Sequence, residues 1–145
     1  MHPSTRFYVR GLFLLGMSAV FVQWSFAEDL ADGAKQNLPA AFDAGWKGEK
    51  TCEVLYELES VRVGRCSFAP GVGHEKHFHV PHFGYVLEGG TMRIRDAAGV
   101  EKVVTTTTGK SWSSDKITVH DVLNIGDTTT SYLVIEPKTE AVVTE

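Results

Sequence analysis

From residue 51 onward the sequence is a succession of short runs rich in β-branched and aromatic residues, separated by turns that contain glycine or aspartate. The runs are CEVLYEL, VRVGRCSF, KHFHV, FGYVL, TMRIRD, EKVVTTT, KITVH and SYLVIE. Short strands at such regular spacing are typical of antiparallel sandwiches and small barrels. The sequence therefore predicts an all-β fold, and a length of 145 residues suits one such domain.

The first 27 residues are typical of a secretory signal peptide. Arg6 and Arg10 precede the apolar run GLFLLGMSAVFV, and the small residues Ser25 and Ala27 follow it. A membrane anchor is the alternative interpretation, but this run is shorter than the roughly 20 apolar residues that a spanning helix needs. We expect cleavage after Ala27 and a periplasmic or secreted protein.

The rest of the chain divides into an N-terminal arm at 28–50 and a domain at 51–140. The arm mixes glycine, proline and alanine with charged residues and has no sustained period. The whole chain carries a formal charge of −4 at pH 7. Removal of the signal peptide, which contains Arg6 and Arg10, makes this −6. Because a negative chain without a basic patch is poorly suited to nucleic acid or a membrane surface, we expect neither of them as a partner.

The two cysteines, Cys52 and Cys66, lie at equal distances from Glu59, seven residues to either side. If this segment forms a hairpin that turns about Glu59, the two sulfur atoms face one another. An even number of cysteines in an exported chain favours a disulfide, which here could add on the order of 3 kcal/mol to the stability. Two buried, reduced thiols are the alternative.

Four of the six histidines fall within the ten residues HEKHFHVPHF, at positions 74, 77, 79 and 82. Alternate residues of a strand share a face, so His77 and His79 point to the same side with their Cα atoms about 7 Å apart. Two imidazoles so placed can bind one metal ion, and His120 is a further candidate ligand. An isolated HxH pair on a solvent-facing strand is the alternative.

Two longer patterns around these histidines resemble the two motifs of the cupin family. Gly71, His77, His79 and Gly90 match the first motif, whose glutamate position is occupied here by Phe83. The second motif is matched by Gly109, His120 and Asn124, while Asp115 and Ile117 replace its proline and glycine. The resemblance covers residues 60 to about 136.

The resemblance implies a cupin-type jelly-roll β-barrel, or double-stranded β-helix, with one divalent transition metal inside. Iron, manganese, zinc, nickel and copper all suit imidazole ligands. His77, His79 and His120 carry over as ligands. Without the glutamate the ion keeps its double positive charge, which favours an anionic ligand in its open positions. His82, rotated inward by a bend at Pro81, or Glu75, which shares the alternation of His77 and His79, can refill the gap.

Side chains also alternate between the two faces of the predicted strand FGYVL, so Phe83 and Tyr85 lie on the same face. If Phe83 faces inward, Tyr85 does too, and it then adds a phenol to the pocket; a core tyrosine with a satisfied hydroxyl is the alternative. Trp112, in GKSWSSDK, either lines the mouth of the barrel or packs within the core.

Three functions are consistent with such a site. The first is a metal-dependent enzyme of dioxygenase type that acts on a small anionic or bidentate substrate, as in some three-histidine cupins. The second is a cupin that binds or senses a small molecule without turnover, and the third is a sugar-type isomerase or lyase. A carboxylate or lysine pointing into the pocket favours the third, and an apolar pocket favours the first. The family resemblance also implies a possible homodimer.

Overall fold

The computed structural model of the protein describes residue 33 and residues 37–138. The signal peptide predicted at 1–27 lies outside the described residues. The described elements with defined bounds are eleven strands: β1 (Gly45–Trp46), β2 (Glu49–Lys50), β3 (Cys52–Glu57), β4 (Val61–Phe68), β5 (Gly73–His79), β6 (His82–Glu88), β7 (Gly90–Asp96), β8 (Glu101–Thr106), β9 (Ser111–Ser114), β10 (Thr118–Asn124) and β11 (Thr130–Pro137). Within this part of the chain, no helix is long and apolar enough to cross a membrane.

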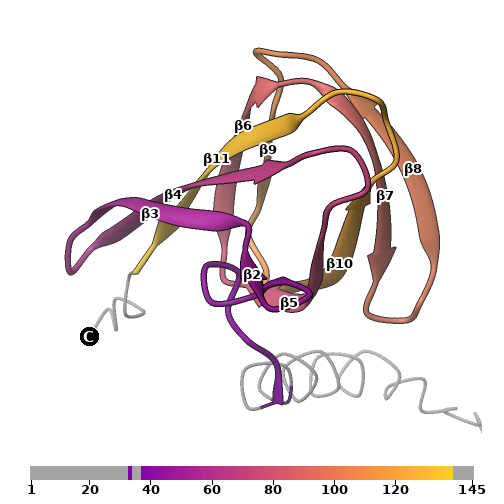
Figure 1. Ribbon diagram of the computed structural model, residues 1–145. Coiled ribbons are helices and arrows are strands. Elements are labelled where there is room, and N and C mark those ends of the chain that lie inside the picture. Colours follow the sequence, from indigo (N-terminus) through magenta and orange to yellow (C-terminus); the bar gives the residue numbers. More distant parts are fainter. Residues whose placement is uncertain (1–32, 34–36, 139–145) are drawn as a thin grey trace, which may run out of the picture.

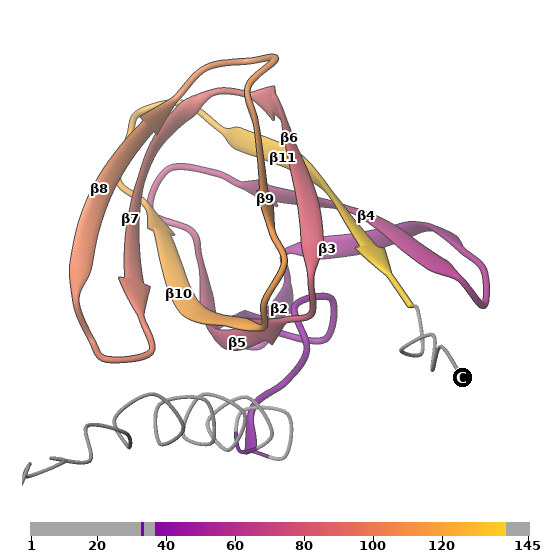
Figure 2. The same ribbon diagram turned by 180° about the vertical axis from the view of Figure 1, so that it is seen from behind.

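Two antiparallel sheets form the body of the molecule. One has the strand order β5-β10-β7-β8 and the other β3-β4-β11-β6-β9, while β1 and β2 make a separate ribbon. The two larger sheets face one another across a common interior (Figures 1 and 2). Each sheet combines one pair of consecutive strands with strands from distant parts of the sequence: β11 pairs with β4 and β6, and β10 pairs with β5 and β7. The all-β prediction is confirmed.

The core lies between the sheets and follows the alternation of the strands. Phe68 on β4, Met92 on β7, Val122 on β10 and Val134 on β11 are each less than a tenth exposed. These residues come from both sheets, so burying them holds the two layers together.

The arm before β3 contributes to the same packing. Ala41 donates its N–H to the Phe78 carbonyl at 2.9 Å, which fixes the arm along β5. Phe42 is 4% exposed, and its ring lies so close to Gly64 that a Cβ at position 64 would be 2.0 Å from it. Gly64 is therefore required as the floor on which Phe42 packs.

Asn124, a matching residue of the second motif, has a structural role. Its side chain is fully buried. The amide nitrogen donates to the carbonyls of Phe68 and Thr128, at 2.7 and 2.8 Å, and the amide oxygen accepts from the Gly126 N–H at 3.0 Å. Asn124 thus ties the end of β10 to β4 and to the turn that leads into β11.

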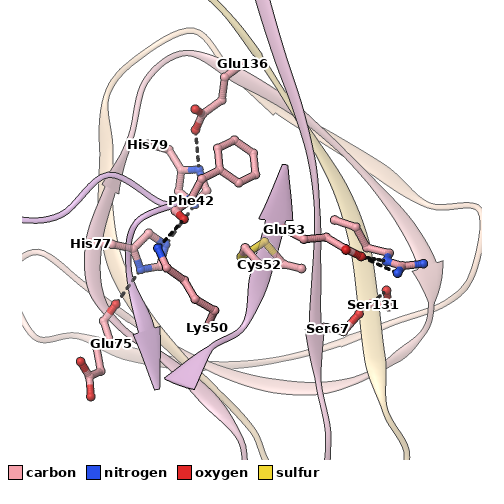
Figure 3. Close-up of a disulfide and its surroundings, with 12 residues drawn as sticks. Phe42, Lys50, Cys52, Glu53, Ser67, Glu75, His77, His79, Ser131 and Glu136 are labelled. Carbon is pink, nitrogen blue, oxygen red and sulfur yellow. Dashed lines mark hydrogen bonds and ion pairs between the residues drawn. A yellow bond between two sulfur atoms is a disulfide. The ribbon is translucent and has the colours of Figure 1, made fainter. Parts of the chain in front are cut away.

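The two cysteines form a disulfide between neighbouring strands. Cys52 on β3 and Cys66 on β4 are direct register partners, with Cα atoms 4.0 Å apart. Figure 3 shows the bridge beside the interior of the protein. The prediction of a bridge is confirmed, and the alternative of two reduced thiols is wrong.

Replacing both cysteines by serine, Cys52→Ser/Cys66→Ser, is expected to lower the free energy of unfolding by about 3 kcal/mol, because the unfolded chain regains the freedom of a 14-residue loop. Urea denaturation of the variant and the parent protein measures the difference. Metal content should stay unchanged, since neither sulfur belongs to the histidine group described below. A variant that loses metal would instead connect the bridge to that group.

Candidate metal centre

An irregularity in β5 decides which of its side chains face the interior. His77 pairs with His120 on β10, but His74 pairs with Val122, so β5 carries one extra residue between these two positions. Because a bulge of this kind reverses the alternation, His74 and His77 both point inward, at 2% and 0% exposure. Glu75 turns outward and accepts the Lys47 N–H. The expectation that Glu75 shares the face of His77 is therefore wrong.

The three predicted ligands come together inside the protein. The candidate ligand atoms of His77, His79 and His120 all lie within 4.8 Å of one another. His77 and His79 are supplied by β5, and His120 by its partner strand β10. Pairing of these two strands thus brings the distant histidine beside the HxH pair.

Hydrogen bonds determine which nitrogens of His77 and His79 are free. The Nδ1–H of His77 donates to the Glu75 main-chain carbonyl at 2.6 Å, and the Nδ1–H of His79 donates to Glu136 Oε1 at 3.2 Å (Figure 3). Each ring then has its proton on Nδ1, which leaves the Nε2 lone pair available. Glu75 therefore helps to orient His77 through its main chain rather than its carboxylate.

The two free nitrogens are close together. His77 Nε2 and His79 Nε2 are 3.1 Å apart, and two lone pairs at this distance repel unless a cation or a proton lies between them. Two bonds of 2.0 to 2.1 Å to one metal ion, at angles between octahedral and tetrahedral values, place their nitrogens about 2.8 to 3.4 Å apart. The spacing fits two ligands of one ion.

All three imidazoles are neutral near pH 7. Burial, followed by the proximity of other histidines, lowers the pKa of His77 to about 3 and that of His120 to about 2. The pKa of His79 is well below its usual value, first because of burial and then because of His77. Neutral imidazole is the form that binds metal, so these residues are ready to bind an ion.

Glu136 also belongs to the site, although no sequence pattern predicted it. This residue on β11 is 6% exposed and accepts the Nδ1–H of His79 from 57 positions away in the sequence. Burial raises its pKa. A carboxylate behind a ligating histidine fixes the ring and makes it more basic. The only signal in the sequence is a charged residue at the end of the apolar run SYLVIE.

The start of β6 places His82 inside and Tyr85 outside. The chain crosses from one sheet to the other over Val80 and Pro81, and the alternation then begins again with His82 facing inward. Phe83 and Tyr85 are consequently 41% and 39% exposed. The expectation that Tyr85 adds its phenol to the pocket is therefore wrong.

Another tyrosine, Tyr132 on β11, lines the cavity instead. Burial raises the pKa of its hydroxyl, so the phenol stays protonated. Its ring meets that of Trp112 edge to face, with ring centroids 5.4 Å apart.

In the first cupin motif the glutamate follows the two histidines after a gap of three or four residues. A gap of three leads to Phe83, and a gap of four leads to Gly84, which is buried. A Cβ at Gly84 would lie 2.1 Å from the Trp112 indole, which occupies the adjoining space. Trp112 therefore lines the cavity while its side chain stays 39% exposed, as expected for a residue at the mouth.

His82 lies beside the three-histidine group without belonging to it. Its ring centroid is 4.5 Å from that of His79. The Nδ1–H donates to the Val80 carbonyl at 2.9 Å, and Nε2 accepts the Trp112 Nε1–H at 3.4 Å. The Trp112 indole thus binds the one nitrogen with which His82 could bind a metal, and coordination by His82 stays a prediction.

Replacing Trp112 with phenylalanine is expected to free His82 Nε2 and to raise the affinity for Zn²⁺ about tenfold, because a fourth nitrogen becomes available. Competition with a chromophoric chelator measures this affinity. The matched control is Trp112→Phe/His82→Phe, in which the gain should disappear. An unchanged affinity in Trp112→Phe would show that His82 is not a reserve ligand.

The histidines lie on the wall of a cavity of about 520 Å³. Apolar side chains of both sheets form much of the remaining wall, together with Trp112 and Tyr132. Two lysines, Lys102 and Lys110, also line it. Among the described residues around this cavity there is no aspartate or glutamate.

Comparison with known proteins identifies the fold. No protein-family model matches the sequence, and no curated protein matches it. A cupin domain from Bordetella pertussis is similar in structure, with 23% sequence identity, a TM-score of 0.58, and coverage of 71% of this chain and 98% of that one. The polyketide cyclase RemF from Streptomyces resistomycificus shares 20% identity with a TM-score of 0.51, over 73% of this chain and 78% of that one. This protein therefore has the cupin fold, with His77, His79 and His120 together in its interior.

Proposed function

We propose that this protein is a metal-dependent enzyme of dioxygenase type that acts on a small organic anion. The observation that carries the proposal is the pair of Nε2 atoms 3.1 Å apart, each with its ring proton held on the opposite nitrogen. His120 adds the third nitrogen. These three nitrogens would hold a divalent ion, and open positions for a ligand would remain, because no further histidine, cysteine or carboxylate among the described residues joins the group.

The residues of the site contribute to this activity in distinct ways. A divalent transition metal held by three imidazoles would supply a Lewis acid or an oxygen-activating centre. Glu136 orients His79, and the Glu75 carbonyl orients His77. Since all three ligands are neutral, they leave the charge of the ion uncompensated and favour an anionic substrate.

The composition of the cavity favours this function over a sugar-type isomerase or lyase. Acid–base chemistry on a sugar needs a positioned side chain that transfers a proton, and a carboxylate or lysine pointing into the pocket would favour it. The described residues that line the cavity include no carboxylate, and Lys102 and Lys110 are exposed. A cupin that binds its ligand without turnover would have the same site, so only an activity measurement distinguishes it from an enzyme.

Oxygen consumption tests the proposal. Metal-free protein is reconstituted anaerobically with Fe²⁺, Mn²⁺, Zn²⁺, Ni²⁺ or Cu²⁺, and oxygen uptake is then recorded with a panel of organic anions. We expect uptake that depends on one metal and one class of anion. A protein that binds metal and anion but consumes no oxygen and changes no substrate is a binding cupin, and that result overturns the enzymatic proposal.

We also propose that the protein is exported. The arginines, apolar run and small residues of positions 1–27 support this, and so does the disulfide, because such bonds persist mainly in oxidising compartments. Expression in a bacterial host, followed by fractionation and mass measurement, tests it. The expected product begins at Glu28 and lies outside the cytoplasm, whereas an intact chain beginning at Met1 in the cytoplasm overturns the proposal.

A further inference from the structure

We infer that the substrate is an amphiphilic organic anion, with a carboxylate or similar group on an apolar body. This inference rests on the proposed function, because it specifies the ligand of the same site. It depends on two properties of the cavity, namely the chemistry of its floor and the sign of its charges.

The floor of the cavity is apolar and belongs to both sheets. Phe68, Met92, Val122 and Val134 form its buried base, and the apolar surface that remains accessible within it belongs to partly buried Ile94, Val104 and Tyr132 and to Trp112, which is 39% exposed. Water beside such a surface gains nothing from hydrogen bonding, so its release by an apolar ligand is favourable. A small polar anion such as acetate would leave most of this surface wet.

The charged side chains that line the cavity are all positive. Lys102 and Lys110 line it and are exposed, whereas the described lining residues include no acidic side chain. Glu136 lies behind His79, where it accepts a hydrogen bond from the ring. The lining side chains therefore carry only positive formal charge in a chain whose net charge is −4, and a bound divalent ion would add to it.

The strand alternation of β8 places one of these charges beside apolar surface. Lys102 and Val104 line the cavity, while Val103 between them is 63% exposed on the opposite face of the strand. Lys110 comes from the connection that leads into β9, the edge strand of the other sheet. Figure 2 shows this connection at the top of the view, where the chain passes from β8 to β9. Positive charge thus flanks the apolar interior from both sheets.

A homologous ligand series tests the apolar part of the inference. Calorimetry measures the affinity of Zn²⁺-loaded and metal-free protein for acetate, butyrate, hexanoate and octanoate. We expect affinity to rise about threefold to fourfold for each methylene group that enters the cavity. Octanol and octylamine have the same chain without the negative charge, and they should bind at least about tenfold more weakly than octanoate.

Charge variants test the electrostatic part. Lys102→Gln/Lys110→Gln should weaken octanoate binding about fivefold while leaving octanol unaffected, because only the anion senses the lost charge. Lys76→Gln is the matched control: this lysine on β5 contacts the Ala97 carbonyl and does not line the cavity. It should leave both affinities unchanged.

The outcomes separate this inference from the proposed function. If metal binds but affinity does not increase along the carboxylate series, the inference is wrong and the metal-dependent function stands. Equal binding of octanoate and octylamine also overturns it. If no metal binds but the chain-length dependence and the lysine effect persist, the proposed function fails while the amphiphilic anion remains supported.

Discussion

The variant His77→Ala/His79→Ala is expected to lose its bound metal, with an affinity for Zn²⁺ more than about 100-fold below that of the parent protein. Removing a single group that only supports a ligand typically reduces metal affinity about 10 to 100-fold. This variant removes two of three ligand nitrogens, and these are the pair that lies 3.1 Å apart. Elemental analysis and chelator competition measure the loss.

A second variant separates metal binding from folding. Both imidazoles are buried, so alanine leaves a cavity and can destabilise the protein for that reason alone. His77→Leu/His79→Leu removes the same nitrogens but fills the space with apolar atoms. It should fold, as judged by circular dichroism, and should lack metal. A folded leucine variant that retains one equivalent of zinc would show that the ion binds elsewhere.

The metal-free protein is expected to lose stability as the pH falls from about 6.5 toward 4. Burial lowers the pKa of His74 to about 4 and that of His77 to about 3, and His79 and His120 are shifted in the same direction. Between these values and the ordinary histidine pKa, the unfolded chain binds protons that the folded chain does not. Stability therefore increases with pH across this window and is lost on acidification.

The expected effect is large because four imidazoles share it. His74, His77 and His120 each contribute up to about 2 kcal/mol of lost stability at pH 5, on the basis of about 1.4 kcal/mol per pH unit, and His79 acts in the same direction. Glu136 acts in the opposite direction, since a carboxyl group with a raised pKa favours the folded state at lower pH. The net loss is then several kcal/mol.

Urea denaturation at about pH 7.5 and pH 5, with chelator present, measures this difference. The leucine variant provides the matched comparison, because it has two fewer buried imidazoles and should show a smaller pH dependence. Equal stability of the parent protein at the two pH values would mean that the histidines are not held neutral in the folded state.

Several features of the site could be predicted from local sequence because they depend on local geometry. Two residues at positions i and i+2 of a strand share a face, so HFH alone placed His77 and His79 together. The symmetric placement of Cys52 and Cys66 about Glu59 likewise predicted their pairing, which the register of β3 and β4 bears out. His120 was identified through the second motif, and the pairing of β10 with β5 supplies the contact.

The tertiary structure decided the features that depend on a single position of register. One extra residue in β5 turns His74 inward and Glu75 outward. The crossing between the sheets at Val80 and Pro81 turns His82 inward and Tyr85 outward. A shift of one residue moves every following side chain to the other face, and no local pattern fixes it. The contact of Glu136 with His79 spans 57 positions and exists only because β11 lies in the sheet opposite β5. The sequence by itself thus determined the strands and the three candidate ligands, whereas strand pairing and the packing of the sheets determined what surrounds them.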